Sequence, residues 1–271
     1  MDYEILEIKP MTANIGAEVF GVDLSEPLTD ALTAELRQAI TDYQVIFFRD
    51  QHIDHDQHKA LGKAFGELAI HSGVAGLAEH PEIVAIHADA NSKFIAGDNW
   101  HSDLTCNDIP PMGSILYLHT VPEVGGDTLF ASMYAAYDAL SDRMKAYLEG
   151  LYAVHDGEHV YRPITNDPDK KFPCNEHPVV RTHPVSGKKG IFVNPSYTTK
   201  IVGMRKDESD GILQMLYKHC ANPNFQVRFR WQPNSIAFWD NRCTWHLAVW
   251  DYFPQTRSGF RVTVAEDKRP A

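Results

Sequence analysis

The sequence has no run of apolar residues that approaches the roughly 20 needed to cross a bilayer, so a membrane-spanning protein is not expected. It has only four cysteines and no C-x-x-C pair, which argues against a disulfide scaffold. The beginning of the chain, Met1–Glu4, is acidic, and we expect no secretory signal. These features predict a protein of the reducing cytoplasm.

Basic residues are also scarce. The chain has 25 Lys and Arg against 36 Asp and Glu, a formal net charge of −11, which disfavours a general binder of nucleic-acid backbones. We therefore expect neither a nucleic-acid partner nor a membrane partner. The 44% apolar and 23% charged residues are an ordinary globular balance, and no repeat or linker divides residues 1–271, which we predict to be one domain. The 14 histidines are the unusual count, and they direct attention to metal ligands.

Short strand patterns separated by turns dominate the middle and end of the chain. Strands are predicted at 44–49, 114–120, 128–130, 179–183, 190–193, 226–231, 235–240 and 261–265. Helices are predicted at 28–40, 56–65, 132–140, 142–150 and 207–220. A polar, proline-containing stretch at 156–177 is predicted to be a surface loop or lid. This order favours a mainly β protein with flanking helices, an antiparallel sandwich or barrel rather than a doubly wound sheet.

The strongest chemical signal is the H-x-D sequence at His101 and Asp103, because residues two apart in an extended segment project to the same side. His246 can provide a third ligand. Two histidines and one carboxylate leave three adjacent positions of an octahedral metal open, the arrangement of non-haem Fe(II) oxygen chemistry. H-x-D alone is weak evidence, since a chain rich in histidine can contain it by chance.

Two arginines follow His246 at defined spacing, Arg257 after 11 residues and Arg261 after 15. Since four residues separate them, a strand places both on the same face. They can be solvated surface residues. However, Arg261 opens an apolar strand, where an inward guanidinium needs an anionic partner such as a carboxylate or sulfonate.

Several motifs together resemble the taurine dioxygenase family of Fe(II)- and 2-oxoglutarate-dependent oxygenases (taurine/phenoxyacetate dioxygenase group). They are His101-x-Asp103, Gly125-Gly126-Asp127-Thr128, Trp239-Asp240-Asn241-Arg242, His246, Arg257 and Arg261. The resemblance extends from about Ile15 to Arg261 and implies a double-stranded β-helix (jelly-roll) core.

The resemblance implies that His101, Asp103 and His246 bind the iron. It assigns the distal carboxylate of 2-oxoglutarate to Thr128 and Arg257. The reaction of this family consumes 2-oxoglutarate and O2, releases succinate and CO2, and hydroxylates the substrate. Related halogenases lack the carboxylate ligand, so the presence of Asp103 indicates hydroxylation. The family also implies a homo-oligomer, a dimer or a tetramer.

For the substrate, the resemblance assigns the anionic group to His71 and Arg261, and pocket positions to Tyr161 and Tyr197. The contacts for the amine of taurine differ. Gly97 stands where the family enzyme has an asparagine, and Ser72–Val74 contain no tyrosine. We therefore expect a small organic anion other than taurine, namely a sulfonate, an alkyl sulfate or a carboxylate.

Two other classes remain open at this point. The same three ligands can hold zinc and activate water for hydrolysis, and a jelly roll can bind an anion without catalysis. Hydrolysis gives no reason for a carboxylate clamp at Thr128 and Arg257. A requirement for Fe(II), O2 and 2-oxoglutarate together distinguishes the oxygenase from both.

Overall fold

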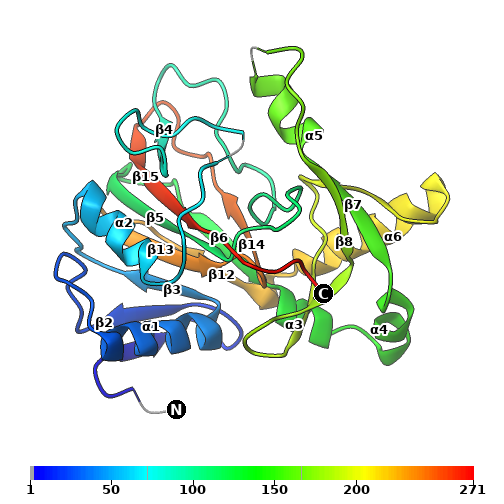
Figure 1. The fold of residues 1–271 in the computed structure, drawn as a ribbon, viewed down its shortest axis with the longest axis horizontal. Coiled ribbons are helices and arrows are strands. Elements are labelled where there is room, and N and C mark those ends of the chain that lie inside the picture. Colours follow the sequence, from blue (N-terminus) through cyan, green and yellow to red (C-terminus); the bar gives the residue numbers. More distant parts are fainter. Residues whose placement is uncertain (1–2, 72, 166) are drawn as a thin grey trace.

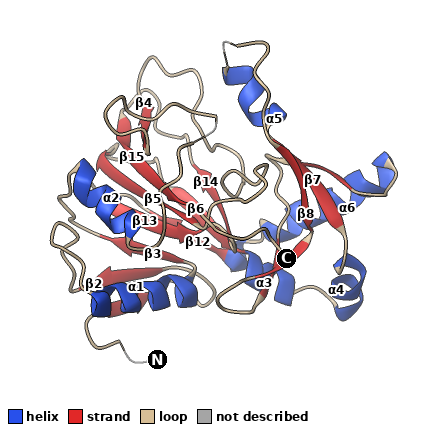
Figure 2. Cartoon of the chain, in the orientation of Figure 1, coloured by secondary structure: helices blue, strands red, loops and turns tan. Residues whose placement is uncertain are grey.

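The computed structural model of the protein describes residues 3–71, 73–165 and 167–271. Two facing β-sheets form its centre (Figure 2). In the described residues the larger sheet has the strand order β1-β2-β3-β13-β5-β15-β4, antiparallel except for the β2–β3 pair. Its strands are β1 Glu7–Pro10, β2 Ala17–Phe20, β3 Val45–Phe48, β13 Ser235–Asp240, β5 Gly113–Thr120, β15 Arg257–Val264 and β4 Ile83–Ala88.

The second central sheet has the order β12-β6-β14, with β12 Gln226–Phe229, β6 Thr128–Ser132 and β14 Thr244–Ala248. Aromatic side chains from both sheets fill the space between them. Phe47 of β3 stacks on Phe229 of β12 with ring centroids 4.0 Å apart, and Phe130 and Trp239 are buried in the same cluster. This contact joins the two sheets into a sandwich whose open end can hold a site.

Helices cover the outer faces of the sandwich (Figure 1). On the larger sheet lie α1 Asp30–Tyr43 and α2 His55–Lys63, which bury Leu36, Ile40 and Leu61 against it. The Thr29 hydroxyl caps α1 by accepting from the amide of Leu32 at 3.2 Å. On the smaller sheet lie α3 Met133–Asp138 and α6 Lys206–Cys220, with α4 Asp142–Leu148 beside them.

Outside the two central sheets, further strands form two smaller sheets. They carry residues 158–164, which face the open end of the sandwich. β7 Tyr152–Asp156 lies between β11 Thr198–Ile201 and β8 Cys174–Pro178, and β9 Val180–Thr182 pairs with β10 Lys189–Ile191. The short helix α5 Glu158–Tyr161 and the 3-10 turn Arg162–Ile164 follow β7. The irregular part of the predicted 156–177 loop is therefore shorter than expected, because residues 174–177 pair with β7.

The predicted fold class is confirmed: the protein is mainly β, with flanking helices around a jelly-roll core. The prediction missed several strands, including β1, β4 and β14. Two of these, β1 and β14, are only four and five residues long, whereas the mostly apolar sequence of β4 (IVAIHA) is itself typical of a strand. The prediction also treated the H-x-D segment as extended. Instead, His101 forms one isolated bridge to His246, and Asp103 begins a turn in which Leu104 has a φ of 52°. None of the helices in the described parts of the chain combines the length and the apolar character that a membrane span requires.

Candidate metal centre and anion sites

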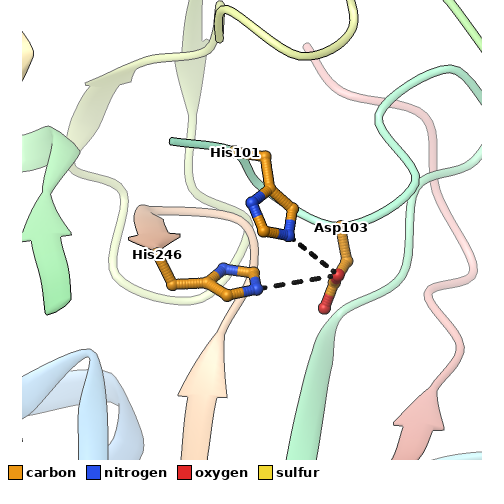
Figure 3. Close-up of side chains that lie close together, drawn as sticks. All are labelled: His101, Asp103 and His246. Atoms are coloured by element: carbon orange, nitrogen blue, oxygen red, sulfur yellow. Dashed lines mark ion pairs between the residues drawn. The ribbon is translucent and has the colours of Figure 1, made fainter. Parts of the chain in front are cut away.

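Three predicted metal ligands meet at the open end of the sandwich. His101 Nε2 and His246 Nε2 each lie 3.7 Å from Asp103 Oδ1, and both rings point toward that carboxylate (Figure 3). All three ligand atoms lie within 4.8 Å of one another. Distances of 3.7 Å are too long for direct hydrogen bonds but leave room for a cation between the donors. The residues present therefore fit an Fe(II) site with one carboxylate and two imidazoles.

The backbone holds the two histidines side by side. The amide of His101 donates to the carbonyl of His246 at 3.1 Å, and the amide of His246 donates back at 2.8 Å. This exchange of bonds brings the 101–103 turn to the β14 strand, and it places the two ring centroids 4.0 Å apart. The site thus depends on a contact between segments that are far apart in the sequence.

The protonation of the histidines suits metal binding. His101 Nδ1 lies 2.8 Å from the carbonyl of Asn99, which can only accept, so Nδ1 carries the proton and Nε2 keeps its lone pair. Burial lowers the pKa of His101, although Asp103 opposes this effect. Burial and the neighbouring His101 lower the pKa of His246 well below its ordinary value. Both rings are therefore neutral at neutral pH, as metal ligation requires.

Asp103 is held as a carboxylate by its neighbours. Ser114 donates to Oδ2 at 2.8 Å, and Arg261 donates to Oδ1 at 3.0 Å. Burial alone raises the pKa of Asp103, but Arg261, with His246 and His101, lowers it well below the usual range. Arg261 therefore contacts the candidate metal ligand directly, a contact that its position in the sequence did not predict.

A second group of possible ligands, His183, Asp240 and Cys243, lies elsewhere in the core. Both ring nitrogens of His183 are occupied: Nδ1 accepts from the amides of Val185 and Ser186, and Nε2 lies 3.0 Å from Asp240. The Asp240 oxygens also accept from Arg242. Since no ring lone pair is free, this group is a hydrogen-bonded core network rather than a metal site.

Arg257 begins β15 of the larger sheet and Thr128 begins β6 of the smaller sheet, and their side chains meet across the sandwich. Arg257 donates to Thr128 Oγ1 at 3.3 Å and to the carbonyl of Gly126 at 3.0 Å, and Trp231 Nε1 donates to Thr128 at 2.9 Å. Burial lowers the pKa of Arg257 to about 10. No carboxylate of the described residues lies within 4.0 Å of its guanidinium. A buried cation with only neutral partners is a strong candidate for binding an anion.

His71 is turned so that one nitrogen can donate. The amides of Gly73 and Val74 both donate to Nδ1 at 3.0 Å, so the ring proton lies on Nε2. Burial and the nearby Arg261 lower the pKa of His71 to about 4. His71 is therefore a neutral hydrogen-bond donor beside a cationic guanidinium, which is a suitable pair for an anionic group.

Tyr161 and Tyr197 form the aromatic side of this region. Their hydroxyl groups lie 2.9 Å apart, and the Tyr161 ring stands edge-on to His71 at 5.9 Å. Both belong to a buried cluster with Leu104 and Cys106. A Cβ on Gly73 would collide with the Tyr161 ring, so the absence of a side chain there allows the His71 loop to pack on α5.

Gly97 and Val74 have no side-chain acceptor for an ammonium group. Gly97 has a φ of +84°, and a Cβ there would lie 3.0 Å from the His101 ring. Beside these residues is a cavity of about 680 Å³ whose wall includes Val74, Ala96, Ile164 and Arg257. The wall contains several further apolar side chains, so the space suits the apolar part of a ligand.

The nine predicted site residues thus fall into three groups: the metal group His101, Asp103 and His246, the pair Arg257 and Thr128, and the group of Arg261, His71, Tyr161 and Tyr197. Sequence reasoning missed Ser114 and Trp231, which bond to Asp103 and Thr128. Neither belongs to a motif with chemical meaning. Only the pairing of strands shows their roles.

Comparison with known proteins gives a match to the family model "Taurine catabolism dioxygenase TauD, TfdA family" over residues 7–263. A solved structure of a taurine dioxygenase from Burkholderia xenovorans superposes with a TM-score of 0.87 at 37% identity, covering 98% of this chain and 91% of that one.

Two curated relatives act on sulfate esters according to their names. An alpha-ketoglutarate-dependent sulfate ester dioxygenase of Pseudomonas putida is 33% identical over 96% of this chain and 89% of its own length. An alkylsulfatase of Acinetobacter baylyi is 32% identical over 96% of this chain and 85% of its own length.

Proposed function

Because the chain belongs to the taurine catabolism dioxygenase TauD, TfdA family, and is thus an Fe(II)- and 2-oxoglutarate-dependent dioxygenase, we propose that it hydroxylates a small organic anion without an ammonium group. A sulfonate or a sulfate ester is the favoured class, and a carboxylate is the next. Succinate and CO2 are the products formed from 2-oxoglutarate.

His101, Asp103 and His246 are the residues that would hold the iron. Bound Fe(II) supplies, with 2-oxoglutarate, the oxidising power for hydroxylation by O2. The protein's contribution is to keep the two imidazoles neutral and Asp103 ionised.

Thr128 and Arg257 would bind the distal carboxylate of 2-oxoglutarate. This assignment rests on the burial of the Arg257 guanidinium among neutral partners, which a carboxylate would compensate. It also disfavours the two other classes, because neither a zinc hydrolase nor a non-catalytic anion-binding protein needs a second buried cation for a cosubstrate.

The observation that carries the substrate proposal is that Arg261, which contacts Asp103, lies close enough to the donor His71 to lower its pKa. An anionic group can take the ring N–H of His71 and the remaining guanidinium donors of Arg261. Tyr161 and Tyr197 would lie beside the uncharged part. The four free cysteines, three of them buried, support our proposal of a reducing cytoplasmic location.

Replacing Arg261 by alanine is expected to separate substrate binding from cosubstrate binding. The kcat/KM for the preferred anion should fall about 10- to 100-fold, since a charge-assisted hydrogen bond is lost. Anaerobic binding of 2-oxoglutarate to the Fe(II) protein should change little. Because Arg261 also contacts Asp103, Co(II) affinity is measured as the control for the metal centre. Unchanged use of anions by Arg261→Ala, with neutral substrates hydroxylated best, would overturn the anion assignment.

The second expectation concerns the amine. A short alkyl sulfonate without an amine should be hydroxylated at least as well as taurine, because burying an ammonium without acceptors is costly. Succinate release with sulfonates, alkyl sulfates and carboxylates of matched length measures this order. A clear preference for taurine over the amine-free sulfonate would show that the amine argument from Gly97 and Val74 is wrong.

A further inference from the structure

The Trp239-Asp240-Asn241-Arg242 motif covers the end of β13 and the first two residues of the turn that leads to β14, and none of its residues is among the ligands proposed above. The turn is buried and internally bonded. The Asp240 carboxylate accepts from the amide and the side chain of Arg242 at 2.7–3.0 Å, and Thr244 Oγ1 donates to the Asp240 carbonyl at 2.8 Å. Arg242 also pairs with Glu266 at 3.0 Å. This turn is therefore a stiff connection that leads directly to His246.

Asn241 is the residue of this turn that faces the metal group. Its Oδ1 accepts from the amide of Asp103 at 2.6 Å, and its Nδ2 donates to the carbonyl of Asp103 at 2.9 Å. Nδ2 also donates to the carbonyl of Pro111 at 3.2 Å. The side-chain amide thus binds both backbone polar groups of one residue, as a neighbouring strand would do.

The backbone of Asp103 needs this support because it belongs to no strand. The residue that follows it, Leu104, has a φ of 52°, a left-handed conformation that is unfavourable for a leucine. Ser114 and Arg261 hold the Asp103 carboxylate, whereas the hydrogen bonds that fix its backbone, and with it the direction in which the side chain leaves the turn, come from Asn241. Asn241 and Asp103 are only 1% and 4% exposed, so water cannot readily replace the amide.

We propose that Asn241 is a positioning residue for the metal centre: its amide fixes the Asp103 backbone to the turn that leads into β14 and His246. Two ligands that are 143 residues apart in the sequence are thereby attached to the same β13–β14 connection, which lowers the cost of bringing them together around an ion. The proposal rests on the assignment of His101, Asp103 and His246 as metal ligands.

The test is Co(II) titration of the chelator-treated full-length protein, compared with a matched control. Asn241→Ala is expected to raise the Co(II) dissociation constant about 10- to 100-fold, the range for partners of metal ligands. Gln51 provides the control because it is also a buried amide with three backbone bonds, to Leu24, Val22 and Arg49, and lies outside the metal group. Gln51→Ala should lose thermal stability while its Co(II) affinity stays within about twofold of wild type.

The outcomes separate this inference from the proposed function. If Asp103→Ala binds Co(II) as well as wild type, the ligand assignment itself fails. If Asp103→Ala loses Co(II) binding but Asn241→Ala keeps wild-type affinity, only the positioning role is wrong. Equal weakening in Asn241→Ala and Gln51→Ala would also overturn it, because general destabilisation would then explain both. If the alanine protein aggregates, Asn241→Ser carries the same expectation, since serine cannot reach both backbone groups.

Discussion

An Asp103→Ala protein is expected to show no Fe(II)-dependent succinate release above that of the metal-free protein, while remaining folded. The carboxylate is the one anionic ligand in the group, and His101 and His246 alone offer only neutral donors. Its removal also leaves Arg261 without its ion-pair partner, so the local charge becomes unfavourable for any cation. Succinate release with excess Fe(II), O2 and 2-oxoglutarate measures the effect, and circular dichroism checks the fold.

The control for this experiment is a buried histidine away from the metal group. His58 of α2 is buried and bonds the carbonyl of Ile115 at 3.1 Å. His58→Ala should reduce thermal stability without abolishing activity at a temperature where the protein is folded. His101→Ala and His246→Ala should resemble Asp103→Ala. Full activity in Asp103→Ala would show that this group of residues does not bind the catalytic metal.

Replacing Arg257 by alanine should have the largest effect on the cosubstrate. Loss of one partner of a buried charge pair costs about 2–5 kcal/mol, which corresponds to roughly 30- to 4000-fold weaker binding of 2-oxoglutarate. Anaerobic titration of the Fe(II) protein, followed by the metal-to-ligand charge-transfer band, measures the dissociation constant. The control is Arg230→Ala, which removes an exposed arginine directly after β12, the strand that pairs with β6. This variant should bind 2-oxoglutarate as wild type does.

The stability of the Arg257→Ala protein provides an independent check. Without 2-oxoglutarate, the wild type buries a guanidinium among neutral groups, so its removal should not destabilise the ligand-free protein strongly. With saturating 2-oxoglutarate, the wild type should gain thermal stability and the variant should gain much less. An unchanged affinity for 2-oxoglutarate in the variant would mean that Arg257 has no role in binding the cosubstrate.

Arg261 connects the metal group with the proposed site for the substrate anion. One guanidinium nitrogen contacts Asp103 Oδ1, the same oxygen that lies 3.7 Å from both histidines. The substrate anion would therefore bind to a side chain that already touches a candidate metal ligand. The apolar strand that begins at Arg261 predicts that an inward guanidinium needs an anionic partner. Asp103 meets part of this requirement, which the sequence alone does not show.

The segment 156–177 illustrates the limit of local patterns. Its prolines and polar residues predicted a loop, yet the last residues pair with β7 as part of β8, and Tyr161 lies on the short helix α5. Composition cannot reveal such pairing, because the hydrogen-bond partners of an edge strand lie elsewhere in the chain. The proposed role of this segment as a lid stays a prediction.

By itself, the sequence determined the main helices, the mainly β class and the identities of the metal-binding candidates. These follow mostly from information that lies within a few residues: apolar spacing, the Thr29 cap and the H-x-D motif. The family resemblance added two predictions: Thr128 and His71 as binding residues, and a jelly-roll core.

Only the tertiary structure decided how these candidates meet. The bond from Asn241 to Asp103 spans 138 residues, and that from Arg261 to Asp103 spans 158. Such contacts arise when strands pair and bury polar groups that must then find partners, and the partner is set by strand order and register rather than by neighbouring residues. For this reason the chemistry of the site could be predicted from residue types, whereas its geometry required the fold.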